Sequence, residues 1–272
     1  MLHQFLIFIL LTWAFAAALM AAVWFTSLRI DNFGIIDIAW SLAFAPVAIF
    51  YALCAPGFET RRWLIGAMVA LWSLRLGIHV GVRVICAHPH EDPRYKEFRE
   101  KWKKNLPLKM FVFFQIQALT IVALCVPFLI IGFNQQAGLN LFEWIGFGIW
   151  LISVGGESLA DHQLKIFKSN PKNKNEVCQA GLWHCSRHPN YFFEWLTWIA
   201  YWIFALGSPL GCVAIYCPAL MLYFLLRVTG IPLTERQSLK SKGEKFREYQ
   251  RTTSMFVPWF PKAAGKNNLQ NI

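Results

Sequence analysis

Five side chains that can bind ligands or move protons lie within eight residues of this sequence: Arg187, His188, Asn190, Tyr191 and Glu194. They open an apolar segment. Polar and charged groups are costly to hold in hydrocarbon without partners, so such residues at the start of a membrane helix indicate a polar cavity. Asn190 and Glu194 are four residues apart and share one face of a helix. The alternative is a helix start that merely carries interfacial anchors.

A second set of polar residues follows helical spacing in an otherwise apolar segment. Glu157, Asp161 and Lys165 are each four residues apart, and Lys168 continues the same stripe. Two carboxylates four apart repel each other unless a cation or hydrogen-bond donors lie between them. Hydroxyl and amide groups of a bound cofactor, or Arg187 and Arg227 from other helices, would supply these. A structural salt-bridge network between helices is the alternative.

Arginines near the end of the chain extend this pattern, because a guanidinium offers a planar fork for phosphate or carboxylate. Arg227 ends an apolar segment, and Glu235 and Arg236 begin a polar one. No Gly-x-Gly-x-x-Gly fingerprint follows a strand, which excludes a Rossmann nucleotide site. The residues expected to form a cytoplasm-facing phosphate pocket are Lys168, Arg187, Arg227, Arg236 and Arg247.

In the first half of the chain, Asp37 and Arg75 lie inside apolar segments. An arginine near the middle of a membrane needs an anionic partner, and Asp37 or a cofactor phosphate would serve. His79 lies one helical turn after Arg75 and reads more readily as a core histidine than as a catalytic one. The charged segment 91–95 follows at the cytoplasmic face and is expected to form an ordered lid or clamp.

Composition places the whole chain in a membrane. Of its 272 residues 56% are hydrophobic and only 15% are charged, whereas soluble domains carry about 25% charged residues. Apolar runs near 20 residues match a bilayer core of roughly 30 Å. We therefore predict an all-α integral membrane bundle of seven transmembrane helices, with a cytoplasmic amphipathic helix over 230–253 that Gly243 interrupts. The seven spans are expected at about 4–26, 33–54, 62–86, 110–133, 141–164, 189–206 and 209–229.

Charge asymmetry between the loops predicts the orientation. Loops 87–109 and 165–188 and the tail after 232 hold seven, five and eight Lys or Arg residues, whereas loops 134–140 and 207–208 hold none. By the positive-inside rule the N-terminus lies outside and the C-terminus in the cytoplasm, as in a bacterial inner membrane. Arg61 and Arg62 conflict with this rule.

The net charge of +11 therefore gathers on one membrane face, where it suits anionic lipid or a polyanionic cofactor. Nucleic acid is excluded as a partner because no separate basic domain exists. The seven cysteines form no Cys-x-x-Cys pair, so neither a disulfide framework nor a metal site is expected. The first positive side chain is Arg29, so the first segment is expected to remain as an anchor and not to be removed as a signal peptide.

Several motifs together resemble the steroid 5-alpha-reductase superfamily, and more closely its bacterial members of the domain-of-unknown-function 1295 type. The shared pattern covers most of residues 30–262. Its parts are Asp-x-x-Trp at 37–40, Leu-Trp-Ser-Leu-Arg-Leu-Gly at 71–77, Glu-Asp-Pro-Arg-Tyr-Lys at 91–96, Gly-Leu-Trp at 181–183, Arg-His-Pro-Asn-Tyr-x-x-Glu at 187–194, the spaced residues Glu235, Gly243, Phe246 and Tyr249, and Val-Pro-Trp at 257–259.

This resemblance implies one membrane domain over 1–272 in which helices 1–4 (1–133) line a cavity for a flat lipidic enone. NADPH would enter from the cytoplasm into a pocket formed by 141–262. The cofactor contacts that the resemblance implies are Glu157, Asp161, Lys168, Asn190, Glu194, Arg227, Glu235 and Tyr249. Because of their positions, we add Lys165, Arg187, His188, Tyr191 and Arg236 to this predicted set.

The resemblance also implies the catalytic residues. Asp37 stands about where steroid reductases place a substrate-binding Glu, Trp72 where they place a Tyr, and Arg75 where they place a following Arg. Trp72 is a departure, since an indole donates one hydrogen bond but does not deliver a proton as a phenol does. Trp40 and His79 are expected to contact the substrate.

The predicted function is NADPH-dependent reduction of an activated C=C bond in a hydrophobic enone such as a 3-oxo-Δ4-steroid, by a monomer in contact with membrane lipids. The alternative is an S-adenosylmethionine-dependent methyltransferase, because isoprenylcysteine carboxyl methyltransferases open their cofactor site with a pattern related to His-Pro-Asn-Tyr. A lipid-binding scaffold without catalysis would leave the polar stripe unexplained.

Overall fold

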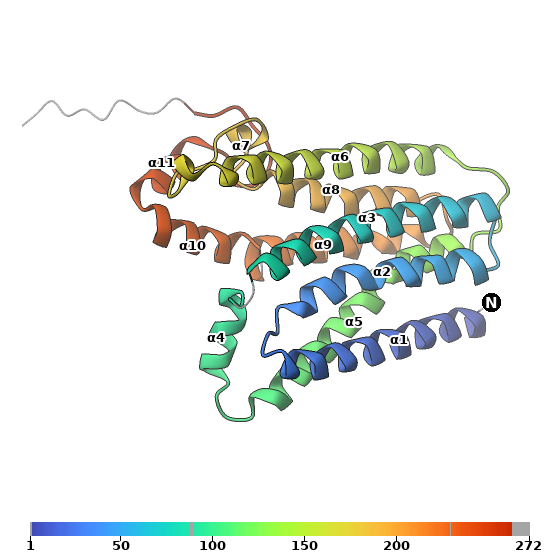
Figure 1. Cartoon of the computed structure of the whole chain (residues 1–272). Coiled ribbons are helices and arrows are strands. Elements are labelled where there is room, and N and C mark those ends of the chain that lie inside the picture. The colour runs from blue at the N-terminus through green and yellow to red at the C-terminus, as the bar shows by residue number, and fades with distance from the viewer. Residues whose placement is uncertain (1, 88–89, 229, 263–272) are drawn as a thin grey trace, which may run out of the picture. The chain divides into compact units, whose positions relative to one another are not determined.

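The computed structural model describes residues 2–87, 90–228 and 230–262, and every regular element among them is helical (Figure 1). The first half contains α1 (Leu2–Arg29), α2 (Ile35–Cys54), α3 (Glu59–Ala87), α4 (Pro93–Lys101) and α5 (Leu106–Gly132). The second half contains α6 (Leu141–Ser169), η1 (Pro171–Asn173), α7 (Leu182–Cys185), α8 (Pro189–Ala205), η2 (Gly211–Ile215), α9 (Tyr216–Tyr223), η3 (Phe224–Val228), α10 (Ile231–Lys242) and α11 (Glu244–Thr252).

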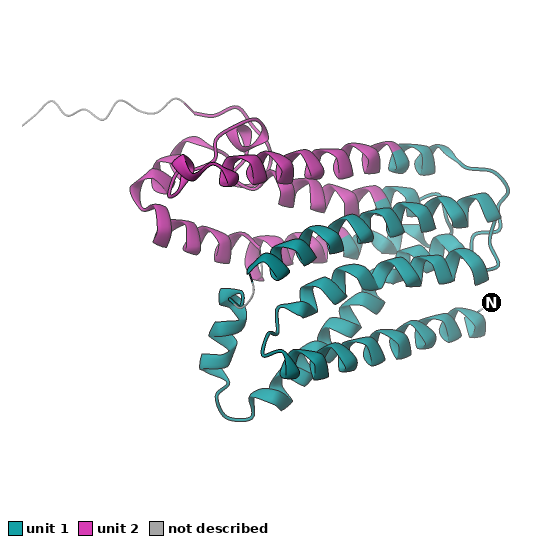
Figure 2. Cartoon of the chain, viewed as in Figure 1, with its two compact units in different colours: residues 1–147, 201–217 teal, residues 148–200, 218–272 magenta. Residues whose placement is uncertain are grey.

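The chain divides into two compact units, coloured separately in Figure 2. Unit 1 comprises residues 1–147 and 201–217, and unit 2 comprises 148–200 and 218–272. The boundaries fall inside α6, α8 and α9 and not in the 134–140 loop. All predicted catalytic and substrate residues belong to unit 1, and all predicted cofactor residues belong to unit 2.

Five helical segments of the described chain are long and apolar enough to cross a membrane: α1, α2, α3, α5 and the run Gly211–Lys242. The chain is therefore a helical membrane protein by the length and composition of these segments. Of the seven predicted spans, α6 carries the polar stripe and α8 has only 17 residues, so neither is among the five. The last run is not one regular helix, because it changes from α9 to the π-helical turn η3 before α10. Since α10 carries Glu235, Arg236 and Lys242, the apolar part of this run ends before α10.

Aromatic side chains fill the interior of unit 1. Trp72 of α3 is completely buried, with Phe44 of α2 at 5.3 Å and Tyr201 at 6.1 Å between ring centroids. Phe128 of α5 packs edge-on against Tyr201 at 4.9 Å, and Trp40 packs against Phe44 at 4.9 Å. Aromatic pairs at these distances add to the energy of burial, so this chain of rings joins α2, α3 and α5 to residues 201–205.

A side chain from α3 forms hydrogen bonds with the backbone of α2 close to the internal proline of α2, Pro46. The Ser73 hydroxyl donates to the Ser41 carbonyl at 2.6 Å and accepts from the Ala45 amide at 3.1 Å. It therefore lies between a carbonyl and an amide that would otherwise pair directly within the helix. A hydroxyl from a neighbouring helix can in this way satisfy backbone groups where the regular hydrogen bonding of a membrane helix is opened. This contact fixes α2 on α3 immediately beside the buried ring of Phe44.

The two arginines that conflicted with the positive-inside rule, Arg61 and Arg62, both form hydrogen bonds with neighbouring residues. Arg61 is 0% exposed and forms an ion pair with Glu143, and its guanidinium also donates to the carbonyls of Asn134, Gln136 and Gly138. Arg62 donates to the carbonyl of Ala52 at 2.8 Å, at the C-terminal end of α2. Glu143 neutralises the charge of Arg61, whereas Arg62 keeps its positive charge, so the conflict with the positive-inside pattern is reduced from two residues to one.

In unit 2, α6 and α8 approach closely at Gly156, where a Cβ atom would lie 2.4 Å from the ring of Phe193. Thr197 of α8 donates to the hydroxyl of Ser153 of α6 at 3.0 Å. Gly243, with φ of 56°, separates α10 from α11, so the predicted interruption of the surface helix is present. A side chain at this φ would be strained, which explains glycine at the bend.

Candidate functional site

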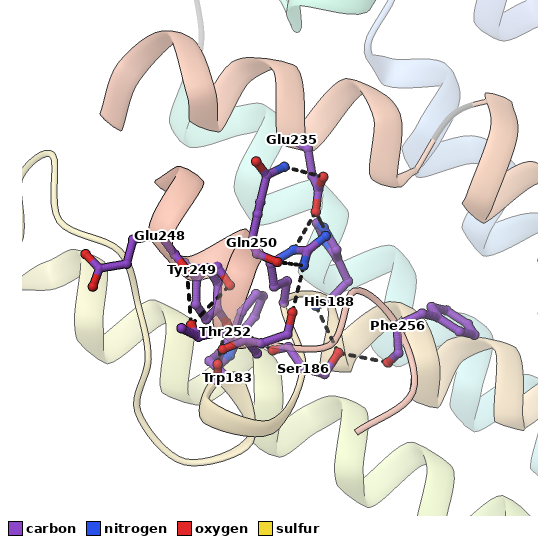
Figure 3. Close-up of polar contacts among 11 residues, drawn as sticks. Trp183, Ser186, His188, Glu235, Glu248, Tyr249, Gln250, Thr252 and Phe256 are labelled. Atoms are coloured by element: carbon purple, nitrogen blue, oxygen red, sulfur yellow. Dashed lines mark hydrogen bonds and ion pairs between the residues drawn. The ribbon is translucent and has the colours of Figure 1, made fainter. Parts of the chain in front are cut away.

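In unit 2, Glu235 is the centre of a compact polar network (Figure 3). Its Oε1 accepts from Nε of Arg187 at 2.8 Å and lies 3.2 Å from Nε2 of His188, and its Oε2 accepts from the Gln250 amide at 2.7 Å. Burial lowers the pKa of His188, although Glu235 acts in the opposite direction, so this imidazole is neutral at pH 7. The ring of His188 stacks on Tyr191 at 5.5 Å. Glu235 thereby joins α10 and α11 to the segment that opens α8.

The same residues hold the C-terminal segment against α7. Arg187 donates to the carbonyls of Gln250 and Thr253 at 3.1 and 2.7 Å. The hydroxyl of Tyr249, which is 2% exposed, donates to the carbonyls of Trp183 and Ser186. Four of the predicted cofactor residues therefore form hydrogen bonds with other residues of unit 2: Arg187, His188, Glu235 and Tyr249. The first role of this network is to order the C-terminal end of unit 2.

A second polar group in unit 2 is better suited to a ligand. Glu157 and Asp161 of α6 are 4% and 8% exposed, and Asn190 of α8 donates from Nδ2 to Asp161 at 3.3 Å. The Oδ1 atom of Asn190 is buried and has no hydrogen-bond partner among the described residues. Glu194, one turn further along α8, is 7% exposed and accepts from the Trp198 indole at 3.0 Å. An unsatisfied buried acceptor costs about 1–3 kcal/mol, so a ligand with amide or hydroxyl donors would be stabilised here.

The remaining predicted cofactor residues belong neither to the Glu235 network nor to the group around Asp161 and Asn190. Lys165, Arg227 and Arg236 are exposed, and none forms a hydrogen bond or ion pair with another described residue. Tyr191 lies between the groups, because its hydroxyl is 3.2 Å from that of Thr234 while its ring stacks on His188. Lys168 is exposed at the end of α6.

In unit 1, Asp37 in the first turn of α2 is held by α4. Its Oδ2 accepts from Arg94 at 2.5 Å, its Oδ1 accepts from the hydroxyl of Tyr95 at 2.8 Å, and Arg83 lies 3.9 Å away. Both oxygens accept, which is the arrangement of an ionised carboxylate. The guanidinium groups that Asp37 meets are thus those of Arg94 and Arg83, whereas the sequence had suggested Arg75.

Helix α4 is fixed at its own start as well. Asp92 caps it by accepting from the Arg94 amide at 2.9 Å, and Pro93 occupies the first turn. Burial alone would raise the pKa of Asp92, but its bonds to Arg94 outweigh this and hold the pKa below its usual range. Burial and the nearby Asp37 charge raise the pKa of Tyr95, so its phenol stays protonated and donates.

A second arginine fork lies beside the first. Arg99 donates to Glu91 at 2.7 Å and pairs with Asp31 at 2.8 Å, and Glu91 accepts from the Phe33 amide at 2.7 Å. The segment 91–99 is thus attached to the chain around the start of α2 at two points, as an ordered clamp. The ordered clamp expected for 91–95 is therefore present, whereas the contact of Tyr95 with Asp37 was not predicted. The Asp-Pro pair at the start of α4 is a sequence signal for this helix.

The other residues predicted for catalysis and substrate binding have different environments. Trp72 is 0% exposed among aromatic rings and contributes to packing. Trp40 donates from its indole to the hydroxyl of Thr120 at 3.0 Å. Arg75 is half-buried and His79 is exposed on α3. Asp37, with 23% of its side chain exposed, is the member of the Asp37–Tyr95 pair that a ligand can reach, since Tyr95 is 3% exposed.

Comparison with known proteins gives a family without an assigned activity. The chain is 25% identical over 270 residues to an uncharacterized protein of Schizosaccharomyces pombe, C594.04c, which covers 87% of this chain and 75% of the relative. No solved structure matches the chain. The family described as "Protein of unknown function (DUF1295)" matches residues 23–253. The chain therefore belongs to the DUF1295 family.

Proposed function

We propose that this protein is an NADPH-dependent reductase of an activated C=C bond in a hydrophobic enone, such as a 3-oxo-Δ4-steroid. The observation that carries the proposal is the buried Oδ1 of Asn190 without a partner, beside Asp161 and Glu157. These atoms are acceptors, and the carboxamide and ribose hydroxyls of a dinucleotide are donors. The resemblance to steroid 5-alpha-reductases supports the same assignment.

When bound, a reduced nicotinamide supplies a hydride to the β-carbon of the enone. Negative charge then develops on the carbonyl oxygen, and a proton must reach the α-carbon. In unit 1, Asp37 is the partly exposed end of a hydrogen-bonded pair whose inner member, Tyr95, is protonated. Asp37 acts as an acid only after it takes up a proton from solvent, because the raised pKa of Tyr95 keeps the phenolic proton on Tyr95. Arg94 holds the carboxyl group in place.

A specific observation favours a second candidate. Two carboxylates four residues apart, Glu157 and Asp161, would suit a cationic cofactor, and S-adenosylmethionine carries a positive sulfur and an amino group. The second candidate is therefore an S-adenosylmethionine-dependent membrane methyltransferase.

Titration of the purified protein with NADPH and with S-adenosylmethionine distinguishes the reductase from the methyltransferase, because the ligand that binds the folded state raises its melting temperature. A shift with S-adenosylmethionine alone would overturn the reductase proposal.

The Asn190 acceptor gives a sharper test of the cofactor site. Asn190→Leu keeps the size of the side chain but removes the unsatisfied oxygen, and should weaken NADPH binding by about 1–3 kcal/mol in isothermal titration. Ser158→Ala is the control, because Ser158 is exposed on α6, the helix that carries Glu157 and Asp161, and its hydroxyl donates to the Val154 carbonyl. Equal affinities of wild type and Asn190→Leu for NADPH would remove Asn190 from the site.

The proposal places the chain in a bacterial inner membrane with seven spans, the N-terminus outside and the C-terminus in the cytoplasm. The ion pair of Arg61 with Glu143 supports this orientation, because it removes one of the two positive charges that lie on the outer side. In a variant without the native cysteines, Gln135→Cys should be labelled by an impermeant thiol reagent from outside and Lys240→Cys only from the cytoplasmic side. Labelling of both from one side would contradict the seven-span arrangement.

A further inference from the structure

Large apolar side chains gather in residues 255–260 of unit 2, after α11 has ended, and most of them point away from the chain. Four have exposed fractions between 41% and 82%: Met255, Val257, Trp259 and Phe260. Phe256 is instead 8% exposed, because its ring packs on Phe192 and Trp195 of α8 at 5.8 Å between centroids in each pair. Contiguous apolar side chains that stay exposed mark a surface for lipid or for another protein.

Hydrogen bonds fix the backbone of this segment against the start of α8. The Ser186 hydroxyl donates to the Phe256 carbonyl at 2.8 Å (Figure 3). The Trp259 amide donates to the Cys185 carbonyl at 2.9 Å. The exposed side chains cannot all turn inward without breaking these bonds, so the segment is preorganised for an apolar environment outside the chain.

The short helix α7 relates this segment to a particular level of α6. Trp183 donates from its indole to the Ala160 carbonyl at 2.9 Å, and the Leu182 amide donates to the Gln163 side chain at 3.0 Å. Both bonds attach α7 to neighbouring turns of α6. Because α7 ends at Cys185, which accepts from Trp259, the exposed segment is held close to the same level.

On α6, exposed apolar side chains extend past this level. Ile152, Leu159 and Ile166 are 64%, 47% and 57% exposed, and their spacing of seven residues places them on one helix face. Such a row is stable against lipid and not against water. Lys165 is exposed beside Ile166, and its ammonium group needs water, so this end of the row lies where hydrocarbon gives way to headgroups. Lipid therefore reaches the level of residues 255–260.

We propose that residues 255–260 are an interfacial anchor, which inserts Trp259 and Phe260 among the lipid headgroups of the membrane that the apolar helices of the chain span. Indole rings are enriched in this layer, where an apolar ring meets acyl chains and a polar N–H meets water. Through its bond to Ser186 the anchor also holds the Glu235 network at a fixed depth beside the membrane surface.

The test places a nitroxide label at Phe260→Cys in a variant without the native cysteines, reconstituted in phosphatidylcholine nanodiscs. Collision rates are measured with oxygen, which concentrates in lipid, and with a nickel chelate, which stays in water. The ratio of oxygen to nickel collisions should be several-fold higher at this position than at Glu248→Cys. Glu248 is the control because it is exposed on α11, a polar helix of the same unit. Val257→Cys should behave as Phe260→Cys does.

The collision rates identify what covers the segment. Nickel collisions as frequent at Phe260→Cys as at Glu248→Cys would show that the segment faces water, and would overturn the proposal. Rare collisions with both reagents would show that a protein surface, such as a second copy of the chain, covers it, and would overturn the proposal equally.

A measurement on the wild-type chain does not depend on the cysteine substitutions. Hydroxyl radicals oxidise indoles that water reaches, and mass spectrometry locates the products. In nanodiscs Trp259 should be oxidised about as slowly as Trp183, although 69% of Trp259 and only 7% of Trp183 is exposed in the chain alone. Oxidation of Trp259 faster than Trp183 in proportion to these two fractions would contradict insertion of Trp259 into the membrane.

Discussion

Arg61→Met is expected to lower the free energy of unfolding by about 3–5 kcal/mol, because it leaves Glu143 charged and buried without its partner. Both side chains are 0% exposed. The substitution also removes donors from the carbonyls of Gln136 and Gly138, which Arg61 holds at 2.7 and 2.6 Å. Equilibrium unfolding of the purified protein in mixed detergent micelles measures the loss.

The adjacent arginine provides the control. Arg62→Met removes the same charge but only a bond to carbonyls at the end of α2, and should cost about 1 kcal/mol or less. In Arg61→Met combined with Glu143→Leu, much of the lost stability should return, because replacement of a whole buried pair by apolar groups is often neutral. Equal losses for Arg61→Met and Arg62→Met would show that the buried pair is not a main support of the fold.

Asp37→Asn is expected to leave the fold and NADPH binding intact and to lower turnover of an enone on the order of 10²–10⁴-fold. Asparagine keeps the size of the side chain and can still accept from Tyr95, but it cannot take up and release a proton. The measurement is NADPH oxidation with androstenedione or progesterone by wild type and variant, alongside unfolding of each. Tyr95→Phe, which removes the hydroxyl bonded to Asp37, should also lower turnover.

The competing explanation is that Asp37 only attaches α4 to α2 through Arg94. In that case Asp37→Asn would lose stability, and turnover would fall only with it. Asp31→Asn is the matched control, because Asp31 pairs with Arg99 of the same helix but its side chain is 85% exposed. Full turnover by a stable Asp37→Asn variant would exclude the acid role, and no wild-type turnover of any enone would count against the reductase proposal.

The sequence by itself determined the class of fold and the family. Apolar runs long enough to span a bilayer predict helices wherever they occur, since only hydrogen-bonded helices satisfy the backbone in hydrocarbon. A local signal was equally reliable at Gly243, which separates α10 from α11 as predicted. Asp92 and Pro93 begin α4, a helix that was not predicted, although an Asp-Pro pair is a common helix start. The spacing of Glu157 and Asp161 along one helix face also needed no tertiary information.

Only the tertiary structure decided which polar groups meet. Arg61 looked like a misplaced surface charge until Glu143, 82 residues later, was found buried against it. Arg187 and Glu235, expected to face a cofactor, bind each other, and Arg187 also donates to the carbonyls of Gln250 and Thr253. Tyr95 reaches Asp37 across 58 residues. Periodicity reports which face of a helix a residue occupies, but the partner on that face depends on how helices far apart in sequence pack, and this information is not local.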